Sequence, residues 1–420
     1  MSQMKVLEAR CISSEFDQRL QIEFSSDGVI TRVGDLEVPR NRLDFYFDDS
    51  CLLFAGMGDV HIHAREDVSG QNNYKEDFIS TFKAMTNGGL CHCGDMPNNP
   101  LPPIDDESYI KKFELTKKAH SAVWPYGGIG PKTKPLSFKI PYKAYMGPSV
   151  GELYFKNFEE LDSALARYQG QWVSFHCEDP QILELSKEEL THFARRPVSA
   201  EVLATHDALK LIEKYQLKGK LCHYSSGEGL KAIREFRKKG NKVLIEVTPQ
   251  HLYFYHENLE DPHYFQMNPP IRSQCDQQAL WDALLKGEID FLATDHAPHT
   301  LEEKQQGVSG LTGLDTYAGF VCWLISQKVP LTVIAKMCSE NPGDFYNEFL
   351  PTFKSLSSEH KYPRGYLKEG FRADFTVLNL KETTLVNEAF LKTKVKHSPF
   401  LGVTFPGKLE ALIQEGRRLV

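Results

Sequence analysis

Gly58-Asp59-Val60-His61-Ile62-His63-Ala64-Arg65 follows an apolar run and a glycine turn, and this stretch is typical of a short buried strand. Successive side chains of a strand point to opposite faces, so His61 and His63 would share one face. Two imidazoles at the end of a strand can bind one metal ion. Arg65 continues the alternation and would place a positive charge beside that ion. An H-x-H pair alone is more often structural, so the residues at the other strand ends decide between the two interpretations.

Length and composition describe an ordinary globular protein. The chain has 420 residues, 41% hydrophobic and 25% charged, with a net charge of −7. An acidic chain gives no electrostatic reason to expect nucleic acid or a membrane surface as a partner. The N-terminus lacks the apolar core of a signal peptide, and the longest apolar run is too short to span a bilayer. Nine scattered cysteines indicate free thiols in a reducing compartment, so we expect a cytoplasmic protein.

The two ends of the chain share the character of short β-strands. Residues 1–55 alternate weakly between apolar and polar, and Ser26-Asp27-Gly28 between two apolar runs is typical of a hairpin turn. Residues 351–420 show the same pattern of short, strand-like apolar runs. Chain ends often pack together, so we expect these two segments to form one small accessory β domain beside a central domain spanning 56–350.

Strand and helix patterns alternate through the central region. The predicted strands span 59–63, 90–95, 122–126, 138–145, 172–176, 220–223, 243–247 and 291–294, with clear helices at 74–87, 199–215 and 228–239. Eight strands separated by helices favour an α/β fold, a parallel sheet closed into a (β/α)8, TIM-like barrel. A doubly wound open sheet is the alternative, but the sequence has no Gly-rich phosphate-binding loop to support it.

Polar residues stand where the predicted strands end. In a β/α barrel the carboxyl ends of all strands meet at one face, which carries the chemistry. Each residue alone has a structural explanation, such as a helix cap for Asp295 or a solvated ammonium for Lys143. Together they predict one metal site made of His61, His63, Lys143, His176, His223 and Asp295. Neutral imidazoles and a carboxylate suit zinc. Lys139 lies on the same predicted strand as Lys143 and competes with it.

Three motifs resemble the dihydroorotase family of the amidohydrolase superfamily. They are His61-Ile-His63-Ala-Arg65, Asp95-Met-Pro-Asn98 and Ala293-Thr-Asp-His-Ala-Pro-His-Thr-Leu-Glu-Glu-Lys304. The first is common among proteins, whereas the third is specific. The C-terminal Ser398-Pro-Phe-Leu-Gly402 and the N-terminal β segment also resemble the long-chain, class I members. The resemblance therefore covers nearly the whole chain.

This resemblance implies a binuclear zinc centre. In it, His61, His63 and Asp295 would bind the more buried ion, His176 and His223 would bind the second, and a carboxylated Lys143 would bridge both. The resemblance also assigns substrate-binding roles to four residues. Arg65, Asn98 and His299 would hold a substrate carboxylate, and Asn268 would contact the substrate from a loop over the site. Residues 310–313 would lie near the ring amide of the substrate.

The implied reaction is the reversible, metal-dependent cyclisation of N-carbamoyl-L-aspartate to L-dihydroorotate in pyrimidine biosynthesis. In the ring-opening direction, a hydroxide bridging the two metals would attack the ring amide, with Asp295 as general acid and base. Arg65 is the main argument for this substrate, because a guanidinium can form a bidentate pair with a carboxylate. Related hydantoinases take neutral rings and have no such need.

Two alternatives stay open. The chain could be another cyclic amidohydrolase, such as a dihydropyrimidinase, hydantoinase or allantoinase. It could also be a non-catalytic dihydroorotase-like subunit that supports a partner, although it keeps all six candidate ligands. We expect a small-molecule substrate and a homodimer, with aspartate transcarbamoylase as the candidate protein partner. The chain departs from the family after Arg65, where Glu66-Asp67 replaces the usual Pro-Gly, so we expect a different loop over the site.

Overall fold

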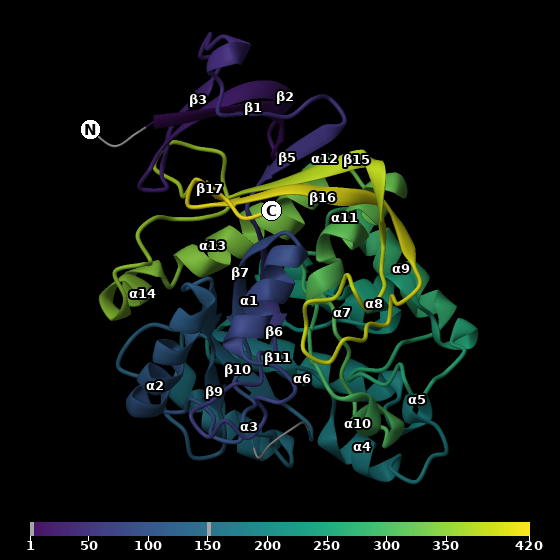
Figure 1. The fold of residues 1–420 in the computed structure, drawn as a ribbon. Coiled ribbons are helices and arrows are strands. Elements are labelled where there is room, and N and C mark those ends of the chain that lie inside the picture. Colours follow the sequence, from purple (N-terminus) through teal and green to yellow (C-terminus); the bar gives the residue numbers. More distant parts are fainter. Residues whose placement is uncertain (1–3, 149–152) are drawn as a thin grey trace.

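The computed structural model describes residues 4–148 and 153–420. Within these residues, parallel strands form a barrel surrounded by helices, and strands from both chain ends form a mixed, mostly antiparallel accessory sheet beside it (Figure 1). The predicted α/β class, with a TIM-like barrel and an accessory β domain built from both ends of the chain, is confirmed.

The barrel strands follow one another in chain order. β6 (Met57–Ile62), β7 (Leu90–Asp95) and β8 (Val123–Pro125) form one parallel sheet. A second sheet contains β9 (Gly127–Ile129), β10 (Tyr142–Tyr145), β11 (Trp172–His176), β12 (Lys218–Leu221), β13 (Val243–Val247) and β14 (Phe291–Leu292). β8 and β9 are separated by Tyr126 alone and share the third strand position. A parallel bridge between Ile62 and His296 joins the last strand position to the first, which closes the barrel.

Some barrel strands have the limits predicted from the sequence, and others differ from them. β7, β11 and β13 have the predicted limits. The segment predicted as 138–145 pairs as a strand only over Tyr142–Tyr145. Pro141 stands directly before this strand, and a proline has no N–H to donate to a ladder. β14 ends at Leu292, before the left-handed turn at Asp295.

The accessory sheet joins segments that are far apart in the sequence. It contains β1 (Met4–Ile12), β2 (Asp17–Ser25), β3 (Ile30–Gly34), β4 (Phe45–Tyr46), β5 (Cys51–Ala55), β15 (Phe375–Leu385), β16 (Thr404–Gln414) and β17 (Arg417–Arg418). β15 pairs with β5, which is the contact between the two chain ends. The predicted hairpin joins β2 to β3, and Gly28 has the positive φ of +79° that this turn requires.

The helices cover the outside of the barrel. They are α1 (Phe78–Asn87), α2 (Asp106–Thr116), α3 (Phe158–Leu165), α4 (Pro180–Leu185), α5 (His192–Arg195), α6 (Val198–Lys214), α7 (Gly227–Lys238), α8 (Pro249–Tyr253), α9 (Gln274–Leu285), α10 (Leu301–Gln305), α11 (Tyr317–Ser326), α12 (Leu331–Ala335), α13 (Asn341–Asn347) and α14 (Leu350–Leu356). α1 begins later than predicted because Asp77 and Ser80 form a reciprocal capping box. α6 begins at Val198, one residue before the predicted start, and Pro197 holds its N-cap position.

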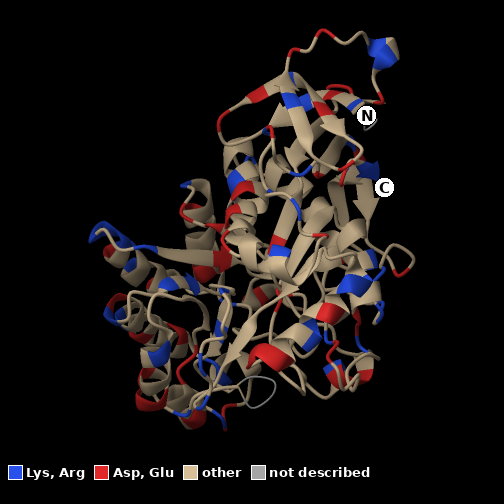
Figure 2. Ribbon diagram, turned by 90° about the vertical axis from the view of Figure 1, so that its left-hand side faces the viewer, with Lys and Arg blue, Asp and Glu red and all other residues tan. Residues whose placement is uncertain are grey.

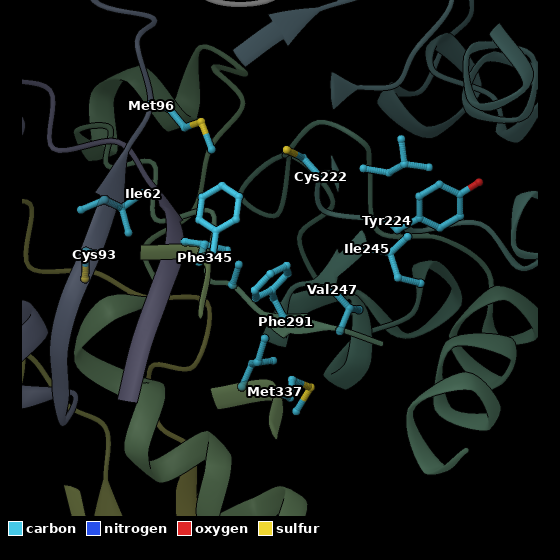
Figure 3. Close-up of a cluster of buried hydrophobic side chains, with 14 of the residues drawn as sticks. Ile62, Cys93, Met96, Cys222, Tyr224, Ile245, Val247, Phe291, Met337 and Phe345 are labelled. Carbon is cyan, nitrogen blue, oxygen red and sulfur yellow. The ribbon is translucent and has the colours of Figure 1, made fainter. Parts of the chain in front are cut away.

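Apolar side chains fill the interior of the barrel below the strand ends. Figure 3 shows Phe291, Met337 and Phe345 packed together among the strands, and the ring centroids of Phe291 and Phe345 lie 6.0 Å apart. All three side chains are almost fully buried, which removes apolar surface from water and stabilises the fold. Within the described part of the chain, no helix is both long and apolar enough to cross a membrane. Figure 2 shows basic and acidic residues interspersed over the ribbon.

Candidate metal and substrate site

A pocket opens where the barrel strands end. Its lining includes eight of the ten predicted site residues: His61, His63, Arg65, Asn98, His176, His223, Asn268 and Asp295. The other two are buried beside it. Lys143 lies over the ring of Tyr145, a lining residue, and His299 contacts Arg65. The structure therefore brings all ten predicted residues to one place.

Three of the predicted ligands converge on one point. The Nε2 atoms of His61 and His63 lie 3.3 Å and 3.0 Å from Oδ1 of Asp295. The other ring nitrogen of each histidine faces an oxygen acceptor, since His61 Nδ1 contacts Glu246 and His63 Nδ1 lies 2.6 Å from Oδ1 of Asn98. If each Nδ1–H donates to its oxygen, both Nε2 atoms present lone pairs to a carboxylate. All three ligand atoms lie within 4.8 Å of one another, so in this tautomer the three acceptors could hold a metal ion between them.

A second pair of histidines lies next to this cluster. His176 Nε2 donates to Glu178 over 2.8 Å, which leaves Nδ1 of His176 facing Nε2 of His223 at 2.9 Å. The rings of His61 and His223 are 5.3 Å apart, so the two groups of ligands are neighbours. This arrangement also fits a metal ion.

Burial keeps these imidazoles neutral. It lowers the pKa of His61 to about 4, lowers the pKa of His63 and His176, and takes that of His223 well below its usual value. Neutral imidazole is the form that binds metal ions. Burial alone would raise the pKa of Asp295, but the neighbouring histidines and Lys143 hold this pKa below its usual value. Asp295 is therefore an anion at neutral pH and can balance a metal ion.

Lys143 is the predicted bridging residue, and its surroundings are unusual for a lysine. Its side chain is fully buried, and its amine has no hydrogen-bond partner among the described residues. A buried ammonium without a partner is costly, whereas a carbamate on this amine would carry two oxygens toward the ligand groups. The competing Lys139 lies at the surface and pairs with Glu348 at 2.6 Å. The orphaned amine of Lys143 fits the bridging role that the resemblance implies.

Arg65 provides a fixed positive charge at the pocket. It is only 4% exposed, its Nη2 donates to Nε2 of His299 over 3.0 Å, and its Nε donates to the Pro298 carbonyl over 3.3 Å. Within the described ranges, no carboxylate pairs with this guanidinium. His299 is held from its other side by Lys75 and Glu303, whose charged groups lie 3.3 Å and 3.1 Å from Nδ1. An anion entering the pocket would therefore meet an uncompensated guanidinium.

The two predicted asparagines face the same space. Oδ1 of Asn98 is occupied by His63, which leaves the amide NH2 of Asn98 as a donor toward the pocket. Oδ1 of Asn268 is buried and has no partner in the part of the chain that the structure describes. Both side chains thus offer polar groups to a bound molecule.

The backbone at the site differs from the strand alternation assumed for Arg65. β6 ends at Ile62, and Arg65 has a φ of +63°, so its side chain reaches the pocket from a left-handed turn and not from a continued strand. His223 and Asp295 also have positive φ, +36° and +47°. Such backbone conformations are costly for residues with a Cβ.

The loop after Arg65 is anchored by the residues that depart from the family pattern. Glu66 accepts a hydrogen bond from the backbone N–H of Phe78 over 2.8 Å and pairs with Lys118. Asp67 accepts from the backbone N–H of Leu101 over 2.7 Å. The loop is therefore tied by carboxylates to α1 and to the segment after β7.

Sequence reasoning missed the residues that orient the ligands. Glu246, on β13, contacts His61 Nδ1 and accepts from the backbone N–H of His223 over 3.0 Å, and its other oxygen pairs with Lys220. Glu178 pairs with Arg196 and accepts from His176. A signal for Glu246 was present, because it is a charged residue inside the apolar run of a predicted central strand.

Comparisons with known proteins add curated relatives that bear the name dihydroorotase. The one from Pyrococcus furiosus is 31% identical over 392 residues, covering 93% of this chain and 86% of the relative. The one from Pyrococcus horikoshii is 32% identical over 87% of this chain and 80% of the relative. The one from Shouchella clausii is 28% identical over 99% of this chain and 97% of the relative. A scan of protein-family models found no match.

Solved structures with the same fold include two hydantoinases. L-hydantoinase (dihydropyrimidinase) from Arthrobacter aurescens superimposes with a TM-score of 0.87 at 21% identity, covering 100% of this chain and 96% of that one. D-hydantoinase (dihydropyrimidinase) from Thermus sp. gives 0.79 at 19% identity, covering 99% of this chain and 95% of that one. At these identities the likeness concerns the fold alone.

Proposed function

This chain belongs to the dihydroorotase family of the amidohydrolase superfamily and is a cyclic amide hydrolase, and we propose that its reaction is the reversible cyclisation of N-carbamoyl-L-aspartate to L-dihydroorotate. The observation that carries this proposal is the guanidinium of Arg65. It is buried at the pocket without a carboxylate partner among the described residues, and dihydroorotate brings a carboxylate that would pair with it.

Arg65, Asn98 and His299 would bind this carboxylate together. A guanidinium can make two parallel N–H···O bonds to one carboxylate, and the free NH2 of Asn98 adds a donor. His299 would orient Arg65 through the bond at 3.0 Å that the two side chains already share. Asn268 would contact the ring from the opposite loop. These contacts would hold the ring amide near Asp295.

Asp295 would move the proton in this reaction. In the ring-opening direction, water adds to the ring amide carbonyl and its proton passes to Asp295. Asp295 then gives the proton to the ring nitrogen as the carbon–nitrogen bond breaks, which yields N-carbamoyl-L-aspartate. Ring closure runs the same transfers backward and releases water. The lowered pKa of Asp295 means that it starts as the base that ring opening requires.

The same proposal includes two zinc ions as cofactors. His61, His63 and Asp295 would hold one ion, His176 and His223 the other, and Lys143, carboxylated, would bridge them. Such ions supply Lewis acidity at the carbonyl and lower the pKa of water. The donor set and the orphaned amine of Lys143 support this assignment. Metal analysis of the purified protein should give about two equivalents per chain, and mass spectrometry of the native protein should show one carboxylated lysine.

A substrate comparison tests the function. The purified, metal-loaded protein is assayed by ultraviolet absorbance with dihydroorotate, hydantoin and dihydrouracil. We expect turnover of dihydroorotate and little or none of the two neutral rings. Turnover of the neutral rings without dihydroorotate would instead establish a hydantoinase or dihydropyrimidinase, whose rings need no cation at the position of Arg65.

The cellular setting completes the proposal. We place the enzyme in pyrimidine biosynthesis in the cytoplasm, because the substrate pair belongs to that pathway. A homodimer and an association with aspartate transcarbamoylase stay predictions. Sedimentation of the pure protein, and co-purification of the two enzymes from the source cells, would test them separately.

A further inference from the structure

Lys304 is buried beside the site in surroundings that the proposed chemistry does not explain. It lies on the short helix α10 and is 1% exposed. Its ammonium donates three hydrogen bonds to backbone carbonyls, to Gln266 over 2.9 Å, to Val308 over 3.0 Å and to Gly310 over 2.9 Å. No carboxylate within hydrogen-bonding distance pairs with it in the described ranges. The three protons of the ammonium are thus matched by three neutral acceptors.

These carbonyls belong to two segments that both reach the pocket. Gln266 lies two residues before Asn268, which lines the pocket, and Gly310 lines it directly. The backbone N–H of Gly310 also donates to the Gln266 carbonyl over 2.9 Å. On the outer side of the first segment, His192 Nε2 lies 2.9 Å from the Met267 carbonyl. The segment around Asn268 is therefore held between α5 and α10. Figure 1 shows both helices at the end of the molecule away from β1 and β2.

Gly310 lies directly against the residues predicted to bind the carboxylate. A Cβ at this position would come within 2.6 Å of the Ala297 carbonyl oxygen and 2.8 Å of a ring carbon of His299. The Gly310 backbone also has a φ of +141°, which residues with a Cβ rarely adopt. A shift of Gly310 would therefore alter the packing of His299, which contacts Arg65.

We infer that Lys304 is a positioning residue that holds the Asn268 segment and the Gly310 segment together over the pocket, so that the substrate-binding groups are preformed. This inference rests on the proposed function, because it assigns substrate contacts to Asn268 and to the Gly310 region. A lysine suits the role because one ammonium donates three bonds from one point. Charge-assisted bonds are also stronger than neutral ones. Preformed loops bind a ligand more tightly, because less ordering remains to be done on binding.

The protonation of Lys304 offers a way to observe this role. Burial lowers its pKa to about 7, while Asp261 acts in the opposite direction. His397 also lies near this ammonium, and Lys304 helps to lower the pKa of His397. His263, which contacts Gln266, and Glu303, the residue before Lys304, are further titratable groups in these segments. As the pH rises through 7, Lys304 loses its charge and one donor. The two segments should then be held less firmly, and the KM for the substrate should rise.

The first experiment compares Lys304→Met with Gln305→Met, an exposed position on the same short helix. Loss of three bonds from a buried ammonium should raise the KM for dihydroorotate about ten- to hundredfold, with a smaller change in kcat and unchanged metal content. Gln305→Met should behave as wild type. An unchanged KM for a folded Lys304→Met protein would overturn the inference.

The second experiment follows KM with pH and adds chemical rescue. Wild-type KM should rise as the pH passes 7, whereas KM of Lys304→Met should be flat over this range. Propylammonium added to Lys304→Ala should lower its KM, because the missing amine is restored. A flat wild-type profile together with no rescue of a folded Lys304→Ala protein by propylammonium would overturn the inference.

The proposed function is judged separately. It fails if wild type does not turn over dihydroorotate, and the same KM comparison on whichever ring is turned over then decides the role of Lys304.

Discussion

Arg65 and Arg372 are equally buried, at 4% exposure, but their surroundings are opposite. Arg372, in the accessory region, pairs with Asp374 at 3.0 Å and with Glu415 at 3.1 Å. Arg65, at the pocket, has one histidine and one carbonyl as partners. A buried charge normally needs an opposite charge close by. The difference supports the proposal that the pocket keeps a cation for a ligand, whereas Arg372 in the accessory region is paired with carboxylates.

Two buried lysines of the barrel also differ in whether their amine has a partner. Lys220 and Lys143 are both fully buried on neighbouring regions of the barrel. Lys220 pairs with Glu246. Burial acts to lower the pKa of Lys220, but Cys222 and Glu246 together raise it above its usual value. The amine of Lys143 has no partner in the described part of the chain. In the proposed site, the paired Lys220 would hold Glu246 in place behind His61, and the unpaired Lys143 would be the residue that is carboxylated.

The largest effect is expected from Asp295→Asn. An amide cannot accept the proton that ring opening releases, so kcat for dihydroorotate should fall by about 10²–10⁴. Asp374→Asn changes a carboxylate of the accessory region and not of the pocket. It should leave kcat unchanged and lower the free energy of unfolding. Steady-state kinetics and thermal unfolding of both variants measure the two effects. Equal losses of kcat in the two variants would show that the contrast between the regions is not functional.

Substitution of Lys220 and substitution of Lys143 should have different effects on the free energy of unfolding. In the metal-free protein, Lys220→Met leaves Glu246 as an unpaired buried charge and should lower the free energy of unfolding by about 3–5 kcal/mol. Lys143→Met removes no partner and should leave the free energy of unfolding unchanged or raise it. Urea unfolding of both variants checks this. A large loss in Lys143→Met would mean that its amine has a structural partner after all.

Substitution of Arg65 and substitution of Arg372 should have different effects on the KM for dihydroorotate. Arg65→Ala removes the pairing of a guanidinium with the substrate carboxylate, so KM for dihydroorotate should rise by about 10²-fold, equivalent to about 2.7 kcal/mol. Arg372→Ala should leave KM at the wild-type value and reduce stability. Arg65→Lys keeps the charge without the bidentate geometry and should give an intermediate KM. Unchanged kinetics in Arg65→Ala would contradict the carboxylate assignment.

The smallest effect is expected from Glu246→Gln. The amide can still accept from His61, but it no longer balances Lys220, so His61 should be held less firmly. Loss of such an orienting partner weakens metal binding by about tenfold or more. The rate of metal release to a chelator measures this. Glu201→Gln is the matched control, because Glu201 is a buried carboxylate that contacts Ser225 and Arg272. Equal release rates in both variants would exclude the orienting role.

Much of the fold could be predicted because the patterns that define it are local. Short strand patterns between helix patterns predicted β7, β11 and β13, and the alternation at both chain ends predicted the accessory strands. Element ends were less predictable, because they depend on caps and on partners. Asp77 moved the start of α1, and the pairing of β14 stopped at Leu292.

The ligand candidates could also be predicted, since histidine, lysine and aspartate at strand ends are visible in the sequence. The contacts that orient these candidates could not be predicted, although Glu246 itself stands out as a charged residue in an apolar strand pattern. Glu246 is brought to His61 and Lys220 from other strands of the barrel, and Lys304 is brought to Gln266 by the folding of two loops. Contacts between residues so far apart in the chain leave no local pattern.

The sequence by itself determined the barrel, the accessory sheet and the set of candidate residues for binding metal and carboxylate, because periodicity and residue chemistry are properties of short segments. The tertiary structure decided which charges are paired and which are free. Pairing depends on the distance between side chains from different strands, and only the closed barrel sets those distances. The tertiary structure therefore shows that Lys139 and Arg372 are paired with carboxylates, whereas Lys143 and Arg65 have no carboxylate partner among the described residues. It also places Arg65 at the pocket through a left-handed turn that strand alternation does not predict.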